Sequence, residues 1–176
     1  MDGDMLLAVD IGNTHITLGV FNGEKLGPRW RMATLINRTS DEFGLQMLGL
    51  FHHSGLQKDD IQAVIIASVV PTLTSGLLKC FKKYLSLDAL VVDAGVKTGV
   101  SIRCDDPRQV GADRVVDAAA AFSMYGGPVI VVDFGTATVF DAVSRDGEYL
   151  GGAIASGITL TAEALFERTS QLRRVE

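Results

Sequence analysis

Cysteine and proline are scarce in this chain of 176 residues, which holds two of the former and four of the latter. The two cysteines, Cys80 and Cys104, form no metal-type pair, so free thiols and a reducing compartment are expected. No apolar stretch is long enough to span a membrane, and no basic region precedes the first apolar run as in a signal peptide. These absences predict a cytoplasmic protein without a membrane partner.

Positive charge is also in deficit, since 16 lysines and arginines stand against 21 acidic residues and give a net charge of −5. This balance disfavours a nucleic-acid partner. Apolar residues make up 47% of the sequence, which supports a packed core. The length allows one ordinary domain or two small ones.

What the chain does contain is a pattern that occurs twice. An apolar run from Met5 to Val9 leads into Asp10-Ile11-Gly12-Asn13-Thr14, and a second apolar run ends at Asn22-Gly23. Residues 129–147 follow the same plan, with Asp133-Phe134-Gly135-Thr136 at the turn and Asp146-Gly147 at the end. Each copy predicts a strand, a glycine turn, a second strand and a hairpin. The copies are too far apart for a solenoid repeat, and predict two similar domains facing one another across a cleft.

Such a turn suits phosphate binding. Glycine lets the backbone approach a ligand closely, and successive N–H groups with a threonine hydroxyl can hold phosphate oxygens. An aspartate at the strand end supplies an oxygen for Mg²⁺, usually through water. A pair of ordinary hairpins is the simpler interpretation, and one copy alone would not decide between them. The repetition favours a nucleotide site.

Between the two copies, the sequence predicts alternating strands and helices. We expect an antiparallel meander of strands at about 5–10, 16–21 and 24–33, followed by a helix capped by Thr39 and Glu42. A strand at 61–70 buried on both faces and a helix opened by Pro71 come next. A short strand at 89–93 and a loop at 95–110 complete this part. Pro28 places the third strand at an edge.

Gly111-Ala112-Asp113-Arg114 precedes an alanine-rich run that predicts a helix. The motif then lies at the helix N-terminus, where backbone N–H groups and the helix dipole favour anions. Asp113 has helix capping as its simpler interpretation. Arg114 is poorly placed with respect to the dipole, which suggests that it is held for a ligand such as a carboxylate. Pairing of Asp117 with Arg114 or with another neighbour stays open.

The end of the chain predicts only part of a second domain. A strand at 148–153, a small-residue segment at 151–157 and a helix at 159–168 follow the second hairpin. We therefore expect a first domain at 1–125 and an incomplete second domain at 126–176. Its missing elements would leave apolar surface and a sheet edge bare.

Three motifs in order carry a resemblance to a known family. Asp10-x-Gly12-Asn13-Thr14, Gly111-Ala112-Asp113-Arg114 and Asp133-Phe134-Gly135-Thr136-Ala137-Thr138 closely resemble type III pantothenate kinases, as do Gly151 to Gly157 and Thr169 to Leu172. The resemblance covers essentially the whole chain. It implies an α/β fold of two ribonuclease H-like (actin-like ATPase) domains with mixed central sheets, the second one truncated.

The resemblance also implies a reaction. Members phosphorylate the primary hydroxyl of pantothenate with ATP, giving 4'-phosphopantothenate in the first step of coenzyme A synthesis. The implied cofactors are ATP, Mg²⁺ and a monovalent cation, K⁺ or NH₄⁺, and the implied assembly is a homodimer.

By motif position, the resemblance assigns a role to each site residue. The ATP phosphates would be lined by Asp10, Ile11, Gly12, Asn13, Thr14, His15, Ile16 and Thr17, and ATP would also meet Thr136. Pantothenate would be bound by Gly111, Ala112, Asp113 and Arg114, with Asp113 as general base. Asp133 would hold the monovalent cation. Cys104 stands where the family usually carries a substrate-contacting tyrosine, and it cannot supply the phenol contact.

Two other functions remain open from the sequence. One is a related kinase acting on another anionic small molecule, for which Arg114 and Cys104 are the discriminating positions. The other is a non-catalytic, nucleotide-binding accessory or regulatory protein. Such a protein has no need of a general base, so Asp113 argues against it.

Overall fold

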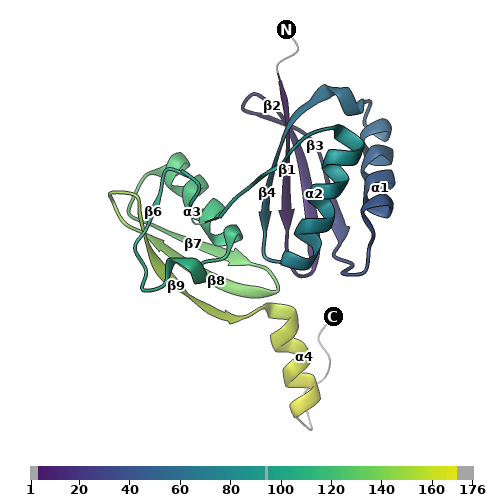
Figure 1. The fold of residues 1–176 in the computed structure, drawn as a ribbon. Helices are drawn as coiled ribbons and strands as arrows, with labels where there is room; N and C mark the ends of the chain where they lie inside the picture. Colours follow the sequence, from purple (N-terminus) through teal and green to yellow (C-terminus); the bar gives the residue numbers. More distant parts are fainter. Residues whose placement is uncertain (1–3, 94, 170–176) are drawn as a thin grey trace. The chain divides into compact units, whose positions relative to one another are not determined.

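The computed structural model describes residues 4–93 and 95–169 (Figure 1). Within this part, the chain forms two compact units, here called unit 1 (residues up to 93, with 111–113) and unit 2 (residues 95–110 and 114–169). The sequence-based boundary between residues 125 and 126 falls inside unit 2 in this division. Helix α3 (Ala112–Tyr125) is the reason, because most of its length belongs to unit 2.

Unit 1 is built on a five-stranded sheet in the order β3-β2-β1-β4-β5. Its strands are β1 (Met5–Ile11), β2 (His15–Asn22), β3 (Lys25–Ala33), β4 (Ile61–Ser68) and β5 (Leu90–Val91). The first three pair antiparallel, and β4 pairs parallel with both β1 and β5. The predicted meander is therefore present, with Pro28 on the edge strand β3.

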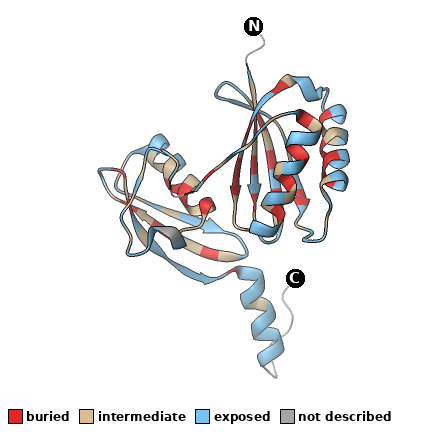
Figure 2. Cartoon of the chain, viewed as in Figure 1, coloured by how far each residue is buried: buried red, intermediate tan, exposed pale blue. Residues whose placement is uncertain are grey.

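The core of unit 1 lies between one face of the sheet and two helices, α1 (Ser40–His53) and α2 (Pro71–Leu85) (Figure 2). Alternate residues of β1 point into it, since Leu7, Val9 and Ile11 are all buried. Phe43 of α1 meets Phe81 of α2 edge-on, with ring centroids 6.1 Å apart. Burial of this apolar face drives the packing of the helices on the sheet.

Helix α1 begins as the sequence predicts. The backbone N–H of Glu42 donates to Thr39 Oγ1 at 3.2 Å, and the backbone N–H of Thr39 donates to Glu42 Oε2 at 2.8 Å. The pKa of Glu42 is lowered by the hydrogen bonds that its carboxylate accepts from the N–H and from the hydroxyl of Thr39, which favour the charged form. The capping box satisfies two backbone donors and fixes where the chain turns from β3 into the helix.

Replacing Gly44 of α1 by alanine is expected to destabilise unit 1 by about 1–3 kcal/mol. A Cβ atom there would overlap the ring of Tyr84 on α2. The ring cannot shift freely, because its hydroxyl donates a 2.8 Å hydrogen bond to Asp41 of α1.

Gly49→Ala is the matched control for this prediction. Gly49 lies on the same helix with open space around it, so alanine should stabilise the protein by about 1 kcal/mol through helix propensity. Urea denaturation measures both free energies of unfolding. Equal stability of the two variants would show that the Tyr84 ring moves aside without cost.

Unit 2 contains a second mixed sheet, in the order β6-β9-β8-β7. Its elements are β6 (Ser101–Ile102), the short 3₁₀ helix η2 (Pro107–Gln109), α3, β7 (Val129–Phe134), β8 (Ala137–Val143), β9 (Glu148–Ser156) and α4 (Ile158–Arg168). Strands β7 to β9 form an antiparallel meander like that of unit 1. Strand β6, parallel to β9, lies in the segment expected to be a loop.

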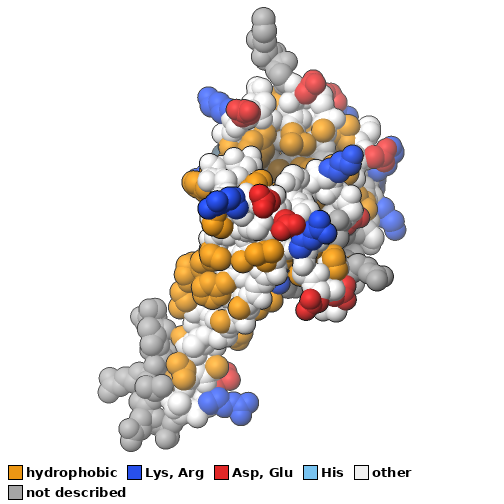
Figure 3. All heavy atoms as spheres, turned by 90° about the vertical axis from the view of Figure 1, so that its left-hand side faces the viewer, with side chains coloured by type: hydrophobic (Ala, Val, Ile, Leu, Met, Phe, Trp, Pro, Cys, Tyr) orange, Lys and Arg blue, Asp and Glu red, His pale blue; other side chains and the backbone are white. Residues whose placement is uncertain are grey.

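The two faces of the unit 2 sheet differ. One face packs against α3, where Ala118, Val143 and Tyr149 are buried. On the other, Ile130 and Phe134 of β7 are 63% and 69% exposed. Figure 3 shows hydrophobic side chains gathered on this part of the surface, next to α4.

The outer edge of β7 has no strand partner among the described residues, whereas β1 of unit 1 is flanked by β4. Bare apolar surface and a bare sheet edge are both as expected for the second copy. No helix in the described part of the chain has the length and apolar character needed to cross a membrane.

Candidate functional site

The two predicted turns are both present, at equivalent ends of their sheets. Residues 12–15 connect the paired residues Ile11 and Ile16, and residues 135–137 connect Phe134 and Thr138. The Gly12 N–H donates to the His15 carbonyl at 2.9 Å, and the Gly135 N–H donates to the Ala137 carbonyl at 2.9 Å. The second turn is therefore one residue tighter than the first.

In each unit, the end of the third strand holds the turn in place. Thr34, which follows β3, donates from its hydroxyl to the Gly12 carbonyl at 2.7 Å and from its N–H to the Thr14 carbonyl at 2.9 Å. Gly157, which follows β9, donates from its N–H to the Thr136 carbonyl at 3.2 Å. Because these bonds occupy carbonyl oxygens of the turn residues, they hold the backbone of each turn in place. Asp10 and Asp133 lie exposed at the strand ends.

Unit 1 also brings the first turn close to the Gly111–Asp113 segment, through Val69. The Val69 N–H donates to the Ile11 carbonyl at 3.0 Å. A Cβ atom on Gly111 would lie 3.3 Å from Val69 Cγ1, so Gly111 packs closely on the same residue. Residues far apart in the sequence thus converge where β1 and β4 end.

The Asp113 carboxylate lies directly over Gly111. A side chain at position 111 would overlap Asp113 Oδ1, so only glycine leaves room for the carboxylate in this orientation. Asp113 is half-buried in the first turn of α3. Unit 1 therefore places the Asp113 carboxylate in the first turn of a helix, and Val69 links this segment to the glycine turn at residues 12–15.

Arg114, the next residue, makes an ion pair inside unit 2. Its Nε donates to Asp141 Oδ1 at 3.0 Å, and its Nη2 donates to the same oxygen at 2.5 Å. The hydroxyl of Tyr149 donates to this oxygen as well, at 2.7 Å. The side chains of Arg114 and Asp141 are 18% and 4% exposed, respectively. Burial, and then the hydrogen bond to Asp141, raise the pKa of Tyr149, so the phenol stays protonated.

Cys104 lies on the same small core. It is half-buried against the cluster of Ala118, Val143 and Tyr149. A Cβ atom on Gly151 would stand 3.7 Å from Cys104 Cβ, so the cysteine packs over β9. Cys104 and Arg114, both predicted from the sequence to face substrate, thus lie around Tyr149.

Asp141 and Tyr149 are residues that the sequence analysis missed. A signal for Asp141 exists, because it is a lone acid between Phe140 and Ala142 in a predicted strand. A charged side chain in such a strand is rarely buried without a partner. No comparable signal marks Tyr149.

A metal ion held by protein side chains alone has no evident place in the described residues, where no cluster of three or more His, Cys, Asp or Glu occurs. Mg²⁺ that accompanies a nucleotide needs less, since it keeps waters and uses one or two carboxylates together with phosphate oxygens. The exposed Asp10 carboxylate fits that requirement.

Comparison with known proteins decides the family. A family model described as type III pantothenate kinase matches residues 6–176. The chain belongs to the type III pantothenate kinase family. This confirms the resemblance drawn from the three motifs, and with it the prediction of a kinase family that acts on pantothenate in coenzyme A biosynthesis.

Several type III pantothenate kinases are similar over nearly the whole chain. The sequence is 55% identical over 172 residues to that of Moorella thermoacetica, covering 98% of this chain and 68% of the relative. For Geobacter sulfurreducens the identity is 52%, with the same coverage. For Dehalococcoides mccartyi it is 50% over 173 residues, covering 98% of this chain and 66% of the relative. The chain spans about two thirds of the length of these relatives.

Solved structures add evidence on the fold alone. The ethanolamine utilization protein EutJ of Carboxydothermus hydrogenoformans has a TM-score of 0.54 at 15% identity, covering 93% of this chain and 56% of that chain. The Aquifex aeolicus Ppx/GppA phosphatase has a TM-score of 0.51 at 15% identity, covering 98% and 58%. The predicted α/β fold with two mixed sheets, that of the actin-like ATPases, is confirmed.

Proposed function

We propose that this protein transfers the γ-phosphoryl group of ATP to the primary hydroxyl of pantothenate, giving 4'-phosphopantothenate. The observation that carries the proposal is the junction at Val69, where the Asp10–Thr17 turn and the Gly111–Asp113 segment meet within unit 1. A phosphate-binding turn and a carboxylate base are what this transfer requires, because phosphoryl transfer depends mainly on positioning and charge neutralisation.

The turn residues supply the positioning. Because the Gly12 N–H is bonded to the His15 carbonyl, the backbone N–H groups that follow it in the turn, with the Thr14 hydroxyl, would hold the phosphate oxygens. Asp10 would hold the Mg²⁺ that accompanies ATP, which supplies charge neutralisation at the phosphates. Thr136 in the second turn is proposed as a further ATP contact.

Asp113 is proposed as the general base. The pantothenate hydroxyl oxygen forms the new bond to the γ-phosphorus, and the bond from that phosphorus to the β,γ-bridging oxygen breaks. The hydroxyl proton passes to the Asp113 carboxylate. Transfer to a positioned base of this kind contributes typically about 10²–10⁴-fold to the rate.

The remaining proposals concern substrate and ions. Arg114 is proposed to bind the pantothenate carboxylate, because a guanidinium matches a carboxylate in charge and shape. Gly111, Ala112 and Cys104 are proposed as further contacts of pantothenate, and Asp133 would hold K⁺ or NH₄⁺. The family resemblance is also the support for a homodimer and for a cytoplasmic location.

The decisive experiment measures 4'-phosphopantothenate formed from pantothenate and Mg·ATP, in K⁺ and in Na⁺ at equal ionic strength. Product that forms faster in K⁺ is the expected result. Product at equal rates in both salts would support the kinase and contradict the monovalent-cation site. Binding of ATP without any product would contradict the kinase and favour a nucleotide-binding accessory role.

A further inference from the structure

The acid Asp141 sits in an unusual place, near the middle of strand β8 and almost fully buried. It is 3% exposed, and its neighbours in the strand are Phe140 and Ala142. A buried carboxylate is costly unless it is paired and hydrogen-bonded. Asp141 meets that need with the guanidinium of Arg114 and the hydroxyl of Tyr149.

The contacts fix the direction of the guanidinium as well as its position. Two donors of Arg114, Nε and Nη2, reach the Asp141 carboxylate, which sets the plane of the group. Arg114 Cζ lies over the ring of Tyr149, 5.8 Å from the ring centroid, so the ring covers another side of the guanidinium. Because Tyr149 also bonds Asp141, the acid itself is held in one orientation.

Strand β9 is shaped to admit this pair. A Cβ atom on Gly152 would stand 2.7 Å from Arg114 Nη2 and 2.6 Å from Asp141 Oδ1. The same Cβ atom would overlap the backbone carbonyl oxygen of Phe140 on β8, so both the close approach of β8 and the ion pair require glycine here. A glycine at this point in a strand sacrifices β propensity, and here it allows the charged groups to lie directly on the sheet.

Stability alone does not explain such an arrangement. A buried ion pair pays a desolvation penalty, and well-packed apolar residues of similar volume often stabilise a fold equally well or better. The pair holds Arg114 at the N-terminal turn of α3, next to Asp113 in the chain.

We propose that Asp141 is a positioning residue that holds the Arg114 guanidinium ready for the carboxylate of the substrate, with Tyr149 and Gly152 fixing the pair. The inference rests on the proposed function, in which Arg114 binds that carboxylate. Asp141 acts through Arg114, and its loss weakens binding of the anionic substrate and not of ATP.

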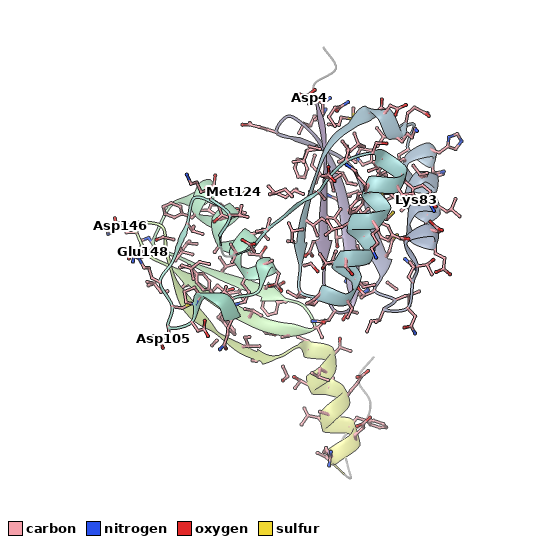
Figure 4. The ribbon with its side chains drawn as sticks, viewed as in Figure 1. Asp4, Lys83, Asp105, Met124, Asp146 and Glu148 are labelled. Atoms are coloured by element: carbon pink, nitrogen blue, oxygen red, sulfur yellow. The ribbon has the colours of Figure 1, made fainter. Side chains whose placement is uncertain are left out.

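The test compares steady-state kinetics of Asp141→Asn with those of the unchanged protein. Asparagine keeps the size of the side chain but loses the charge that orients Arg114. We expect the KM for pantothenate to rise about tenfold or more, as is usual when a charge-assisted hydrogen bond is lost, with the KM for ATP little changed. Asp146→Asn is the matched control, since Asp146 is an exposed acid at the β8–β9 turn (Figure 4).

A double-variant cycle separates positioning from a merely structural role. With Arg114→Ala as background, adding Asp141→Asn should leave kcat/KM for pantothenate unchanged, because the acid has nothing left to orient. If Asp141→Asn lowers kcat/KM for pantothenate by the same factor with and without the Arg114 guanidinium, the proposal is overturned. A rise in the KM for ATP as large as that for pantothenate would also overturn it.

Tyr149→Phe protects the test against a folding failure of Asp141→Asn. It removes one hydrogen bond to Asp141 and keeps the ring and the ion pair, so a rise of about three- to tenfold in the pantothenate KM is expected. An unchanged KM would count against the proposal. Failure of the unchanged protein to bind or phosphorylate pantothenate would overturn the proposed function, and this inference with it.

Discussion

Asp113→Asn is expected to lower kcat for pantothenate phosphorylation by about 10²–10⁴-fold, the usual contribution of a positioned general base. An amide has the size of the carboxylate but cannot accept the hydroxyl proton. Since the chemical step alone is affected, the KM for ATP should change little. Product formation under saturating Mg·ATP and pantothenate measures the loss.

The structure explains why this variant should keep its fold. Asp113 is the second residue of α3, so asparagine loses only the interaction of one negative charge with the helix dipole, about 0.3–1 kcal/mol, and α3 retains its start. The amide also fits over Gly111 where the carboxylate lies, because the two groups have the same shape. The melting temperature should therefore stay close to that of the unchanged protein.

Asp59→Asn provides the control, because it makes the same substitution at an exposed acid of unit 1. It should leave kcat unchanged. An Asp113→Asn protein with a normal kcat would remove Asp113 from the role of base. It would also favour helix capping as the reason for the residue.

Local rules were sufficient for most of the fold. The capping box of Thr39 and Glu42, the helix opened by Pro71 and the two hairpins each depend on residues a few positions apart, and all are present. Strand β6 was missed because two residues carry no periodicity, and its pairing with β9 is set by the tertiary structure. Burial of β4 on both faces was overestimated, since Gln62 and Ala63 are exposed near its start.

The residues of the candidate site could be predicted only where they lie next to one another in a sequence motif. The turn after Asp10 and the Gly111–Arg114 segment could each be identified from a few consecutive residues. The partner of Arg114 could not be found this way, because Asp141 is 27 positions away on another element and the hydrogen bond forms only when α3 packs on the sheet. The link through Val69 is equally non-local, since it depends on the parallel pairing of β1 with β4.

Asp10→Asn is expected to lower kcat/KM for Mg·ATP by about 10- to 100-fold, the usual effect of removing a group that holds a metal through its outer shell. Asp10 lies near the end of β1, paired with Thr17 on one side and Ala67 on the other. Its backbone is thus fixed at the centre of the sheet, and asparagine changes only the charge offered to the ion. The Mg²⁺ concentration that gives half-maximal rate should rise, and excess Mg²⁺ should restore part of the activity.

Asp4→Asn is the matched control, because Asp4 precedes the same strand at its other end (Figure 4). Both variants lose one exposed negative charge, so a general effect of net charge on ATP binding would appear in both. A shift of the Mg²⁺ dependence confined to Asp10→Asn would place the ion at the carboxyl end of β1. A normal Mg²⁺ dependence in Asp10→Asn would contradict the phosphate-turn assignment. Since the N–H groups of the turn are unchanged in this variant, such a result would leave Asp10 with a structural role at the strand end.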